Sequence, residues 1–209
     1  EADLHFCGGR LLAPRLVRLS HSPSRPIRLS LDFRGAISNL RIEEQHRDRV
    51  VQLGDGEAEL AIRAVGLNFR DVLNVLGAYP GDPGQPGSDC SATIDSVGAG
   101  AAPLARGVSV LGHATAALAS FARADTRLLA AFAESLTFEE ACTLPTTWST
   151  VHMALQATRL VGGQRTLVHA GAGGVGLCAI EYVCWLHARV RATAGRPHKH
   201  GRLYGAGMA

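Results

Sequence analysis

The stretch that decides the fold is Arg165-Thr166-Leu167-Val168-His169-Ala170-Gly171-Ala172-Gly173-Gly174-Val175-Gly176, in which a short apolar run leads directly into a glycine-rich turn. After the turn, apolar residues recur at helical spacing, and the face that they predict consists of Val175, Ala179, Tyr182, Val183 and Leu186. A second apolar run follows from Val190 to Ala194. This order predicts a β-α-β unit with parallel strands, and we expect the first strand to be buried.

Three glycines in this turn have the spacing of a dinucleotide-binding fingerprint: Gly171, Gly173 and Gly176. Such glycines allow a tight turn, a close approach of the backbone to a pyrophosphate, and close packing of the helix against the strand. The free amides at the helix N-terminus also suit an anion. The alternative is a glycine-rich turn that binds nothing. We predict a cofactor site that consists of Gly171, Ala172, Gly173, Gly174, Val175 and Gly176.

The residues after the second strand bear on the choice between NADH and NADPH. An acidic side chain there would bind a ribose hydroxyl, whereas basic side chains would accept a 2′-phosphate. No acidic residue occurs after Glu181, and Arg196 and Lys199 lie just past the strand. We therefore predict NADPH as the cofactor, with Arg196 and Lys199 as ligands of its phosphate. The alternative is that both are solvated surface charges.

Strand-like segments dominate the chain before this unit. A helical repeat interrupts them at 69–76, a loop rich in glycine and proline follows at 77–87, and helical patterns return at 135–140 and 146–160. The expected strands are 27–31, 58–65, 92–97 and 108–111. The fold class is therefore mixed α/β, and we divide the chain into a linker (1–26), a β-rich domain (27–145) and a partial cofactor domain (146–209).

Composition excludes several classes of protein. With 46% hydrophobic and 19% charged residues, the chain can bury a core, and its net charge of only +3 gives little support to nucleic-acid or membrane binding. Its five cysteines are widely spread and contain no C-x-x-C pair, so neither a disulfide framework nor a thiolate zinc site is indicated. No apolar stretch follows a basic start in these residues, so we expect no secretory signal. We expect a cytoplasmic protein.

Three segments together resemble a known family: Gly66-Leu67-Asn68-Phe69-Arg70-Asp71-Val72-Leu73, Gly77-Ala78-Tyr79-Pro80-Gly81, and the glycine turn at 170–176. They are similar to the enoyl reductase domain of type I polyketide and fatty acid synthases. That domain lies in the quinone oxidoreductase-like, zinc-free branch of the medium-chain dehydrogenases and reductases. The resemblance covers about 27–209, and residues 10–17 look like the linker that precedes the domain in synthases.

The resemblance implies a GroES-like substrate domain followed by a Rossmann cofactor domain, with the active site between them. The implied reaction transfers hydride from NADPH to the β-carbon of an α,β-unsaturated acyl thioester and then protonates the α-carbon. Asn68 and Thr150 would lie beside the nicotinamide, and Asn68 and Tyr79 would be the catalytic residues. A phenol is a reasonable proton donor to an enolate. The alternative is that Tyr79 is only a loop aromatic that covers the cleft.

The resemblance also implies partners for the chain, and the chain differs from zinc-binding relatives of the family at one motif. The substrate would be an enoyl thioester on the phosphopantetheine of an acyl carrier protein, beside neighbouring synthase domains. The Gly-His-Glu motif of zinc-binding relatives is replaced by Gly87-Ser88-Asp89, so we predict no metal, although Cys90 and His113 are conceivable ligands. Because later family elements have no counterpart before Ala209, we expect a fragment of a longer synthase. A free-standing NADPH quinone reductase and an inactive structural remnant are the alternatives.

Overall fold

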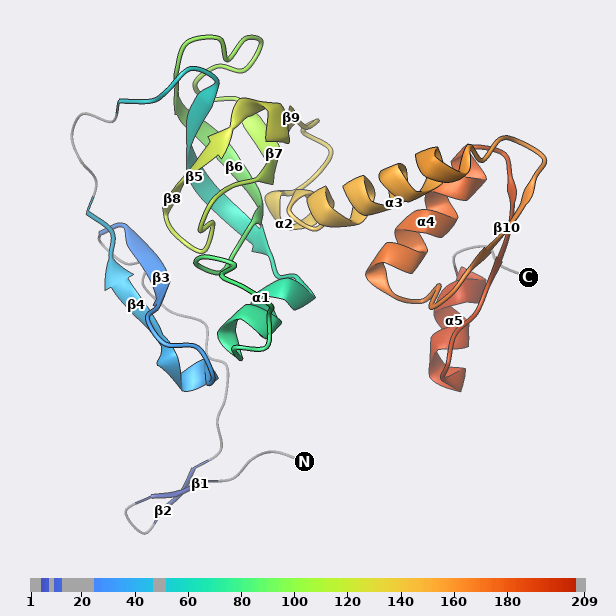
Figure 1. Cartoon of the computed structure of the whole chain (residues 1–209), viewed down its shortest axis with the longest axis horizontal. Coiled ribbons are helices and arrows are strands. Elements are labelled where there is room, and N and C mark those ends of the chain that lie inside the picture. Colours follow the sequence, from blue (N-terminus) through green and yellow to red (C-terminus); the bar gives the residue numbers. More distant parts are fainter. Residues whose placement is uncertain (1–4, 8–9, 13–24, 47–51, 206–209) are drawn as a thin grey trace.

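The computed structural model describes residues 5–7, 10–12, 25–46 and 52–205. Figure 1 shows a β-rich part, a smaller α/β part, and helix α3 running from one toward the other. This arrangement confirms the mixed α/β class expected from the sequence. The predicted linker lies mostly outside the described residues, and within it β1 (His5–Cys7) pairs antiparallel with β2 (Arg10–Leu12).

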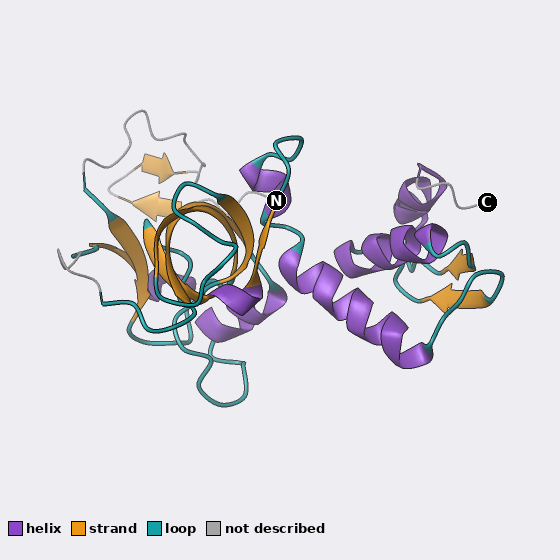
Figure 2. Ribbon diagram, turned by 90° about the horizontal axis from the view of Figure 1, so that it is seen from above, coloured by secondary structure: helices purple, strands orange, loops and turns teal. Residues whose placement is uncertain are grey.

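The centre of the β-rich part is a five-stranded antiparallel sheet in the order β8-β5-β6-β7-β9, and Figure 2 shows its strands curving around one another. Its interior is filled by small and branched apolar side chains, among which Leu60, Ile94 and Val110 are at most 1% exposed. The sequence patterns did not predict the two strands of this sheet at 121–125 and 129–131. The five strands are β5 (Glu57–Gly66), β6 (Asp89–Val97), β7 (Ser109–His113), β8 (Phe121–Asp125) and β9 (Leu129–Ala131).

A two-stranded hairpin lies beside this sheet. It consists of β3 (Ile27–Leu31) and β4 (Leu40–Glu44), which are joined through the 3-10 turn η1 (Ile37–Asn39). The Leu29 amide donates a hydrogen bond to the Leu118 carbonyl at 2.7 Å, which ties the hairpin to the loop before β8. A second 3-10 turn, η2 (Thr126–Leu128), connects β8 to β9.

Helix α1 (Phe69–Val75) buries two polar side chains together with Val75 and exposes several of its apolar ones. Asp71 and Asn74 are buried, whereas Phe69 is 74% exposed and Val72 is 46% exposed. The helical repeat correctly predicts the helix, but the apolar repeat is not the face that packs on the sheet. The buried face is polar because Asp71 and Asn74 hydrogen-bond to backbone groups of the loop that follows the helix.

Two helices lead out of the sheet. Helix α2 (Phe138–Ala141) lies within the predicted helical pattern and begins with a cap, in which Thr137 Oγ1 accepts a hydrogen bond from the Glu140 amide at 3.2 Å. Helix α3 (Pro145–Thr158) begins at the predicted boundary between the two domains, although the division into domains itself stays a prediction. In the part of the chain that the structure describes, no helix is long and apolar enough to cross a membrane.

The α/β part contains the predicted β-α-β unit. Strands β10 (Arg165–Val168) and β11 (Arg189–Ala192) pair in parallel, helix α4 (Gly174–Trp185) connects them, and α5 (Pro197–Gly205) follows. The prediction of a buried first strand is wrong: Leu167 is 55% exposed, because α4 and α5 cover the other face of the two strands.

The predicted apolar face of α4 is also only partly correct. Val175 is 45% exposed, whereas Ile180, which the prediction omitted, is 1% exposed and packs with Ala172 and Leu203. Tyr182 turns toward α3 instead, where its ring lies 5.5 Å from that of Trp148. The helix therefore packs against two neighbours, which a single apolar stripe does not describe.

Candidate functional site

Asn68 occupies the turn between β5 and α1, at the edge of the β-rich part. Its backbone N–H donates to the Asp71 carboxylate at 2.9 Å, which fixes the turn. Gly66, two residues earlier, allows the carbonyl of Cys142 to approach, because any Cβ at position 66 would collide with that oxygen. The missing side chain brings the α2-α3 connection close to Asn68.

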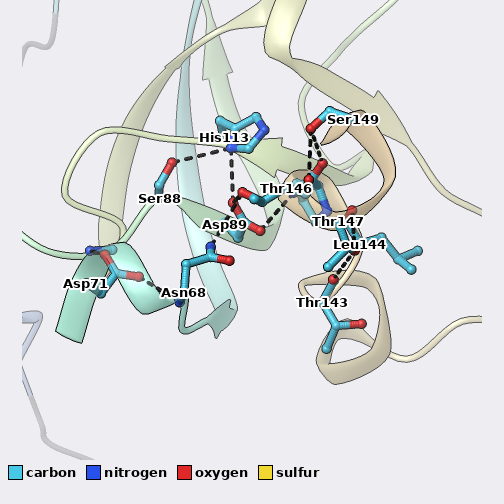
Figure 3. Close-up of polar contacts among 12 residues, drawn as sticks. Asn68, Asp71, Ser88, Asp89, His113, Thr143, Leu144, Thr146, Thr147 and Ser149 are labelled. Atoms are coloured by element: carbon cyan, nitrogen blue, oxygen red, sulfur yellow. Dashed lines mark hydrogen bonds and ion pairs between the residues drawn. The ribbon is translucent and has the colours of Figure 1, made fainter. Parts of the chain in front are cut away.

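A hydrogen-bonded cluster connects Asn68 to the first turn of α3 (Figure 3). The Asn68 amide donates to Thr146 Oγ1 at 3.5 Å, and that hydroxyl donates to the Asp89 carboxylate at 2.6 Å. The same carboxylate accepts the Thr146 backbone N–H at 2.9 Å and lies 3.1 Å from Nδ1 of His113. We call Asn68, Asp89, His113 and Thr146 the polar cluster. Its members come from three segments of the β-rich part and from α3.

Asp89 is the centre of this cluster and is almost fully buried. Burial opposes its ionisation, but hydrogen bonds from His113, from both groups of Thr146 and from Asn68 outweigh this effect, and its pKa lies below the ordinary value of 3.8. The carboxylate also lies at the N-terminus of α3, where a negative charge is favoured. The cluster therefore holds a stable negative charge between the β-rich part and α3.

The glycine turn lies against the same turn of α3. A Cβ built on Gly174 would be 4.0 Å from Cγ2 of Thr147, the residue after Thr146. Of two adjacent residues of α3, Thr146 thus belongs to the polar cluster and Thr147 lies near the start of α4 in the glycine turn. This brings two sequence motifs about a hundred residues apart to one place in the molecule.

The glycine turn is shaped as a dinucleotide site requires. A Cβ on Gly176 would be 2.5 Å from the Ala170 carbonyl oxygen and 2.7 Å from Gly171 Cα, so that close helix packing depends on glycine. At Gly173 the nearest atom would be 3.4 Å away, and both Gly173 and Gly174 are exposed at the start of α4. The backbone is therefore open where a pyrophosphate would bind, and the residues present fit a dinucleotide.

The predicted phosphate ligands lie at the carboxyl end of β11. Arg196 directly precedes α5, Lys199 lies in its first turn, and both side chains are exposed. The Lys199 amide donates to the Arg196 carbonyl at 2.9 Å, which keeps the two residues together. Two cations are thus available at the end of the second strand, and their assignment to a 2′-phosphate stays a prediction.

Tyr79 lies in the loop after α1, and its side chain is half-buried. Its amide and that of Ala78 donate to the Leu73 carbonyl at 3.2 and 2.8 Å, so that the loop turns back on the end of the helix. Asp71 accepts the Gly87 amide at 2.9 Å at the far end of the loop. One carboxylate, Asp71, therefore fixes both the Asn68 turn and the loop that carries Tyr79.

Thr150 does not belong to the polar cluster. It lies one helical turn after Thr146 on α3, and its side chain is exposed. Its expected place beside a nicotinamide stays a prediction. Sequence reasoning missed Asp71, Asp89 and Thr146 as members of the site. An acidic residue at the start of an apolar strand, together with Pro145-Thr146 at the start of a helix, is the signal that could have identified the cluster.

Cys90 and His113, the two conceivable metal ligands, lie on opposite faces of the sheet. Cys90 is buried in the core of the β-rich part, and burial raises the pKa of its thiol to about 12. His113 lies opposite Asp89 in the sheet and contacts Asp89 and Ser88. Successive strand residues point to opposite faces, so Cys90 lies away from His113. Among the described residues, no group of three or more His, Cys, Asp or Glu side chains could hold a metal ion.

Comparisons with known proteins give the site a context. A family model described as the alcohol dehydrogenase GroES-like domain matches residues 54–179. The chain is 37% identical over 211 residues to the erythronolide synthase EryA2 of Saccharopolyspora erythraea, in an alignment that covers 99% of this chain and 6% of the synthase. The chain thus spans only a small part of that relative's length.

Solved structures show the same relationship. The crystal structure of the CurK enoyl reductase superposes with a TM-score of 0.80 at 32% identity, covering 89% of this chain and 59% of that one. A mycobacterial protein in complex with NADPH superposes with a TM-score of 0.75 at 31% identity, covering 88% and 56%. These similarities confirm the predicted resemblance and the predicted pairing of a GroES-like part with a partial Rossmann-like sheet.

Proposed function

The chain belongs to the family of alcohol dehydrogenase GroES-like domains, and from this premise we propose that it serves NADPH-dependent enoyl reduction in a polyketide or fatty acid synthase. The proposed substrate is an α,β-unsaturated acyl thioester on the phosphopantetheine of an acyl carrier protein. The proposed setting is cytoplasmic, beside other synthase domains. The similarity to EryA2 and to the CurK enoyl reductase supports this class of reaction.

One observation carries the proposal: in the first turn of α3, Thr146 is hydrogen-bonded within the polar cluster and the adjacent Thr147 lies near the glycine turn. A reductase must hold its cofactor and its substrate side by side, because hydride transfer requires contact between the reacting carbons. Thr146 and Thr147 link a dinucleotide-type turn to Asn68 at the edge of the substrate part. Helix α3 is therefore the element that aligns the two halves of the site.

In this proposal, the backbone from Gly171 to Gly176 binds the pyrophosphate, and Arg196 and Lys199 bind the 2′-phosphate of NADPH. Asn68 and Thr150 lie beside the nicotinamide. The bound cofactor would supply the hydride that adds to the β-carbon of the thioester. The polar cluster holds the Asn68 side chain through Thr146 and Asp89, so that its amide is preorganised before the substrate arrives.

Protonation of the α-carbon is assigned to Tyr79. The phenol O–H bond breaks, a C–H bond forms at the α-carbon of the enolate, and solvent returns a proton to the phenolate. The half-buried loop position keeps the ring partly out of water while leaving it open to such an exchange.

The test compares NADPH consumption with an enoyl-pantetheine thioester and with a quinone. We expect oxidation of NADPH with the thioester, its loss in Asn68→Ala, and wild-type rates in Asn39→Ala, a matched asparagine that only bonds the Phe33 carbonyl. Turnover of the quinone alone would identify a quinone reductase instead. A folded chain that binds NADPH but reduces neither compound would indicate a structural remnant, and both results contradict the proposal.

A further inference from the structure

The loop from Gly77 to Gly87 is held by side chains of α1. Asp71 accepts the Gly87 amide at 2.9 Å, and Asn74 donates to the Gly84 carbonyl at 3.0 Å. Arg34 supports the same loop from the hairpin, where its guanidinium lies 2.6 Å from the Asp82 carboxylate. These contacts fix the loop backbone, but none of them involves the ring of Tyr79.

The ring of Tyr79 has a partner in Arg70. The guanidinium carbon of Arg70 lies 5.4 Å from the centre of the Tyr79 ring, within the range of a cation–π contact. The same guanidinium donates to the Pro83 carbonyl at 3.2 Å, so that its position is fixed at a second point. Within the described residues, the Tyr79 hydroxyl makes no hydrogen bond. Arg70 is thus the side chain that determines where the ring lies.

In the described part of the chain, Arg70 forms no ion pair with a carboxylate. Asp71, its neighbour in sequence, accepts the backbone amides of Asn68 and Gly87, and Asp82 pairs with Arg34. The cation therefore faces the ring without a competing carboxylate. A planar guanidinium can stack on a ring and donate a hydrogen bond at the same time, which an ammonium group does less well.

We propose that Arg70 is a positioning residue that fixes the ring of Tyr79 for proton transfer to the α-carbon. This inference rests on the proposed enoyl reduction and on the assignment of Tyr79 as donor. Asn68 is the N-cap of α1 and Arg70 lies in its first turn, so the helix that begins at the amide of the hydride end also carries the side chain that contacts the phenol ring. The cation also stabilises the negative charge that develops on the phenol oxygen as its proton leaves.

A double-mutant cycle tests this inference. Reduction of an α-methyl enoyl-pantetheine thioester by NADPH is measured for wild type, Arg70→Gln, Tyr79→Phe and the double variant, together with the configuration of the product at the α-carbon. We expect Arg70→Gln to lower kcat about tenfold, with a smaller change in KM, and to erode the configuration. In the Tyr79→Phe background it should have no further effect, because the group it positions is absent. Arg70→Lys should recover part of the loss.

The matched control is Arg34→Gln, which removes a cation that contacts the same loop at Asp82 but does not contact the Tyr79 ring. It should change the rate equally in the wild-type and Tyr79→Phe backgrounds. If Arg70→Gln also behaves in this way, its role is structural and the inference is wrong.

A readout without turnover separates this inference from the proposed function. The chain has three tyrosines, so a ring-labelled sample gives three NMR signals, and Tyr79→Phe identifies the one of interest. We expect Arg70→Gln to shift this signal and to leave those of Tyr182 and Tyr204 in place. An unchanged Tyr79 signal would overturn the ring contact. A shifted signal in a chain that reduces no enoyl thioester would contradict the proposed function while the contact itself stands.

Discussion

The β-rich part and the α/β part are stabilised in different ways. The β-rich part closes around a continuous apolar core of ten buried residues, whereas the corresponding core of the α/β part has three. The α/β part depends more on backbone packing at Gly171 and Gly176 and on ring contacts between α3 and α4. The difference indicates that the β-rich part is the more rigid of the two and that the α/β part is held by a few close contacts.

The polar cluster lies where the β-rich part meets α3, and its hydrogen bonds join residues of the sheet to the first turn of that helix. Asp89 and His113 extend from the rigid sheet, while Thr146 starts the helix that leads to the glycine turn. A change in the cluster should therefore affect the stability of the sheet less than the position of α3. The following substitutions test this contrast in order of expected effect.

The two buried isoleucines give the most direct comparison of the two cores. Ile94 and Ile180 are both 1% exposed, one in each core. Ile94→Ala should lower the free energy of unfolding by about 3–5 kcal/mol, because the rigid sheet cannot collapse around the cavity. Ile180→Ala should cost less and should increase hydrogen exchange chiefly in α4 and β11. Equal losses by chemical denaturation, with exchange spread over the whole chain, would contradict the contrast.

Substitution of Asp89 tests the junction. Asp89→Asn should lower the free energy of unfolding by about 1–3 kcal/mol at neutral pH, because it removes a charged acceptor from the Thr146 groups. Since the pKa of Asp89 is lowered in the folded chain, its stabilisation is complete above about pH 4 and is lost as the pH falls through the folded pKa.

The pH dependence provides the control for this substitution. The difference in unfolding free energy between wild type and Asp89→Asn should shrink as the pH falls below about 4 and through the folded pKa of Asp89. Asp32→Asn, which removes a carboxylate from an exposed turn, should leave the profile unchanged. A difference that stays constant over this range would show that the charge of Asp89 is not what stabilises the junction.

Gly176→Ala tests the backbone packing of the α/β part. Because a Cβ there would lie 2.5 Å from the Ala170 oxygen and 2.7 Å from Gly171 Cα, helix α4 must move. We expect a loss of about 1–3 kcal/mol in thermal unfolding and a weakening of NADPH binding by at least tenfold, measured by calorimetry. Gly201→Ala, at a position with no atom within 4 Å, is the control. Unchanged binding in Gly176→Ala would argue against the site.

The smallest effect is expected on the open face of β10. Leu167 is 55% exposed, so Leu167→Thr should change the unfolding free energy by less than about 0.5 kcal/mol. Thermal unfolding of the wild type and of Leu167→Thr under identical conditions checks this value. A loss of more than about 2 kcal/mol in the unfolding free energy would indicate that Leu167 and strand β10 are buried after all.

The sequence predicts much of this architecture. Its repeats predict α1, α3, α4 and the β10-α4-β11 order because each has a local pattern. Burial was less predictable: the polar face of α1 is buried because Asp71 and Asn74 bond to a loop that lies next to them only after folding. Strands β8 and β9 are short and contain few large apolar residues, and they form the two opposite edges of the five-stranded sheet, so that their positions depend on the strands beside them.

In the candidate site, too, the sequence predicts the local motif but not the contacts between distant residues. The glycine turn is contiguous in sequence and its geometry is as expected, whereas the polar cluster joins residues from positions 68 to 146. No local pattern indicates that Asp89 and Thr146 meet. Their contact depends on the absence of a side chain at Gly66, which allows the α2-α3 connection to approach.

The most direct test of the account is a titration of the chain with NADPH and with NADH, followed through the fluorescence of Trp148 and Trp185 on α3 and α4. Saturable quenching that is tighter for NADPH, and a preference that disappears in Arg196→Ala, are the predicted results. A folded chain that responds to neither cofactor, or equally to both, would contradict an NADPH site at the glycine turn.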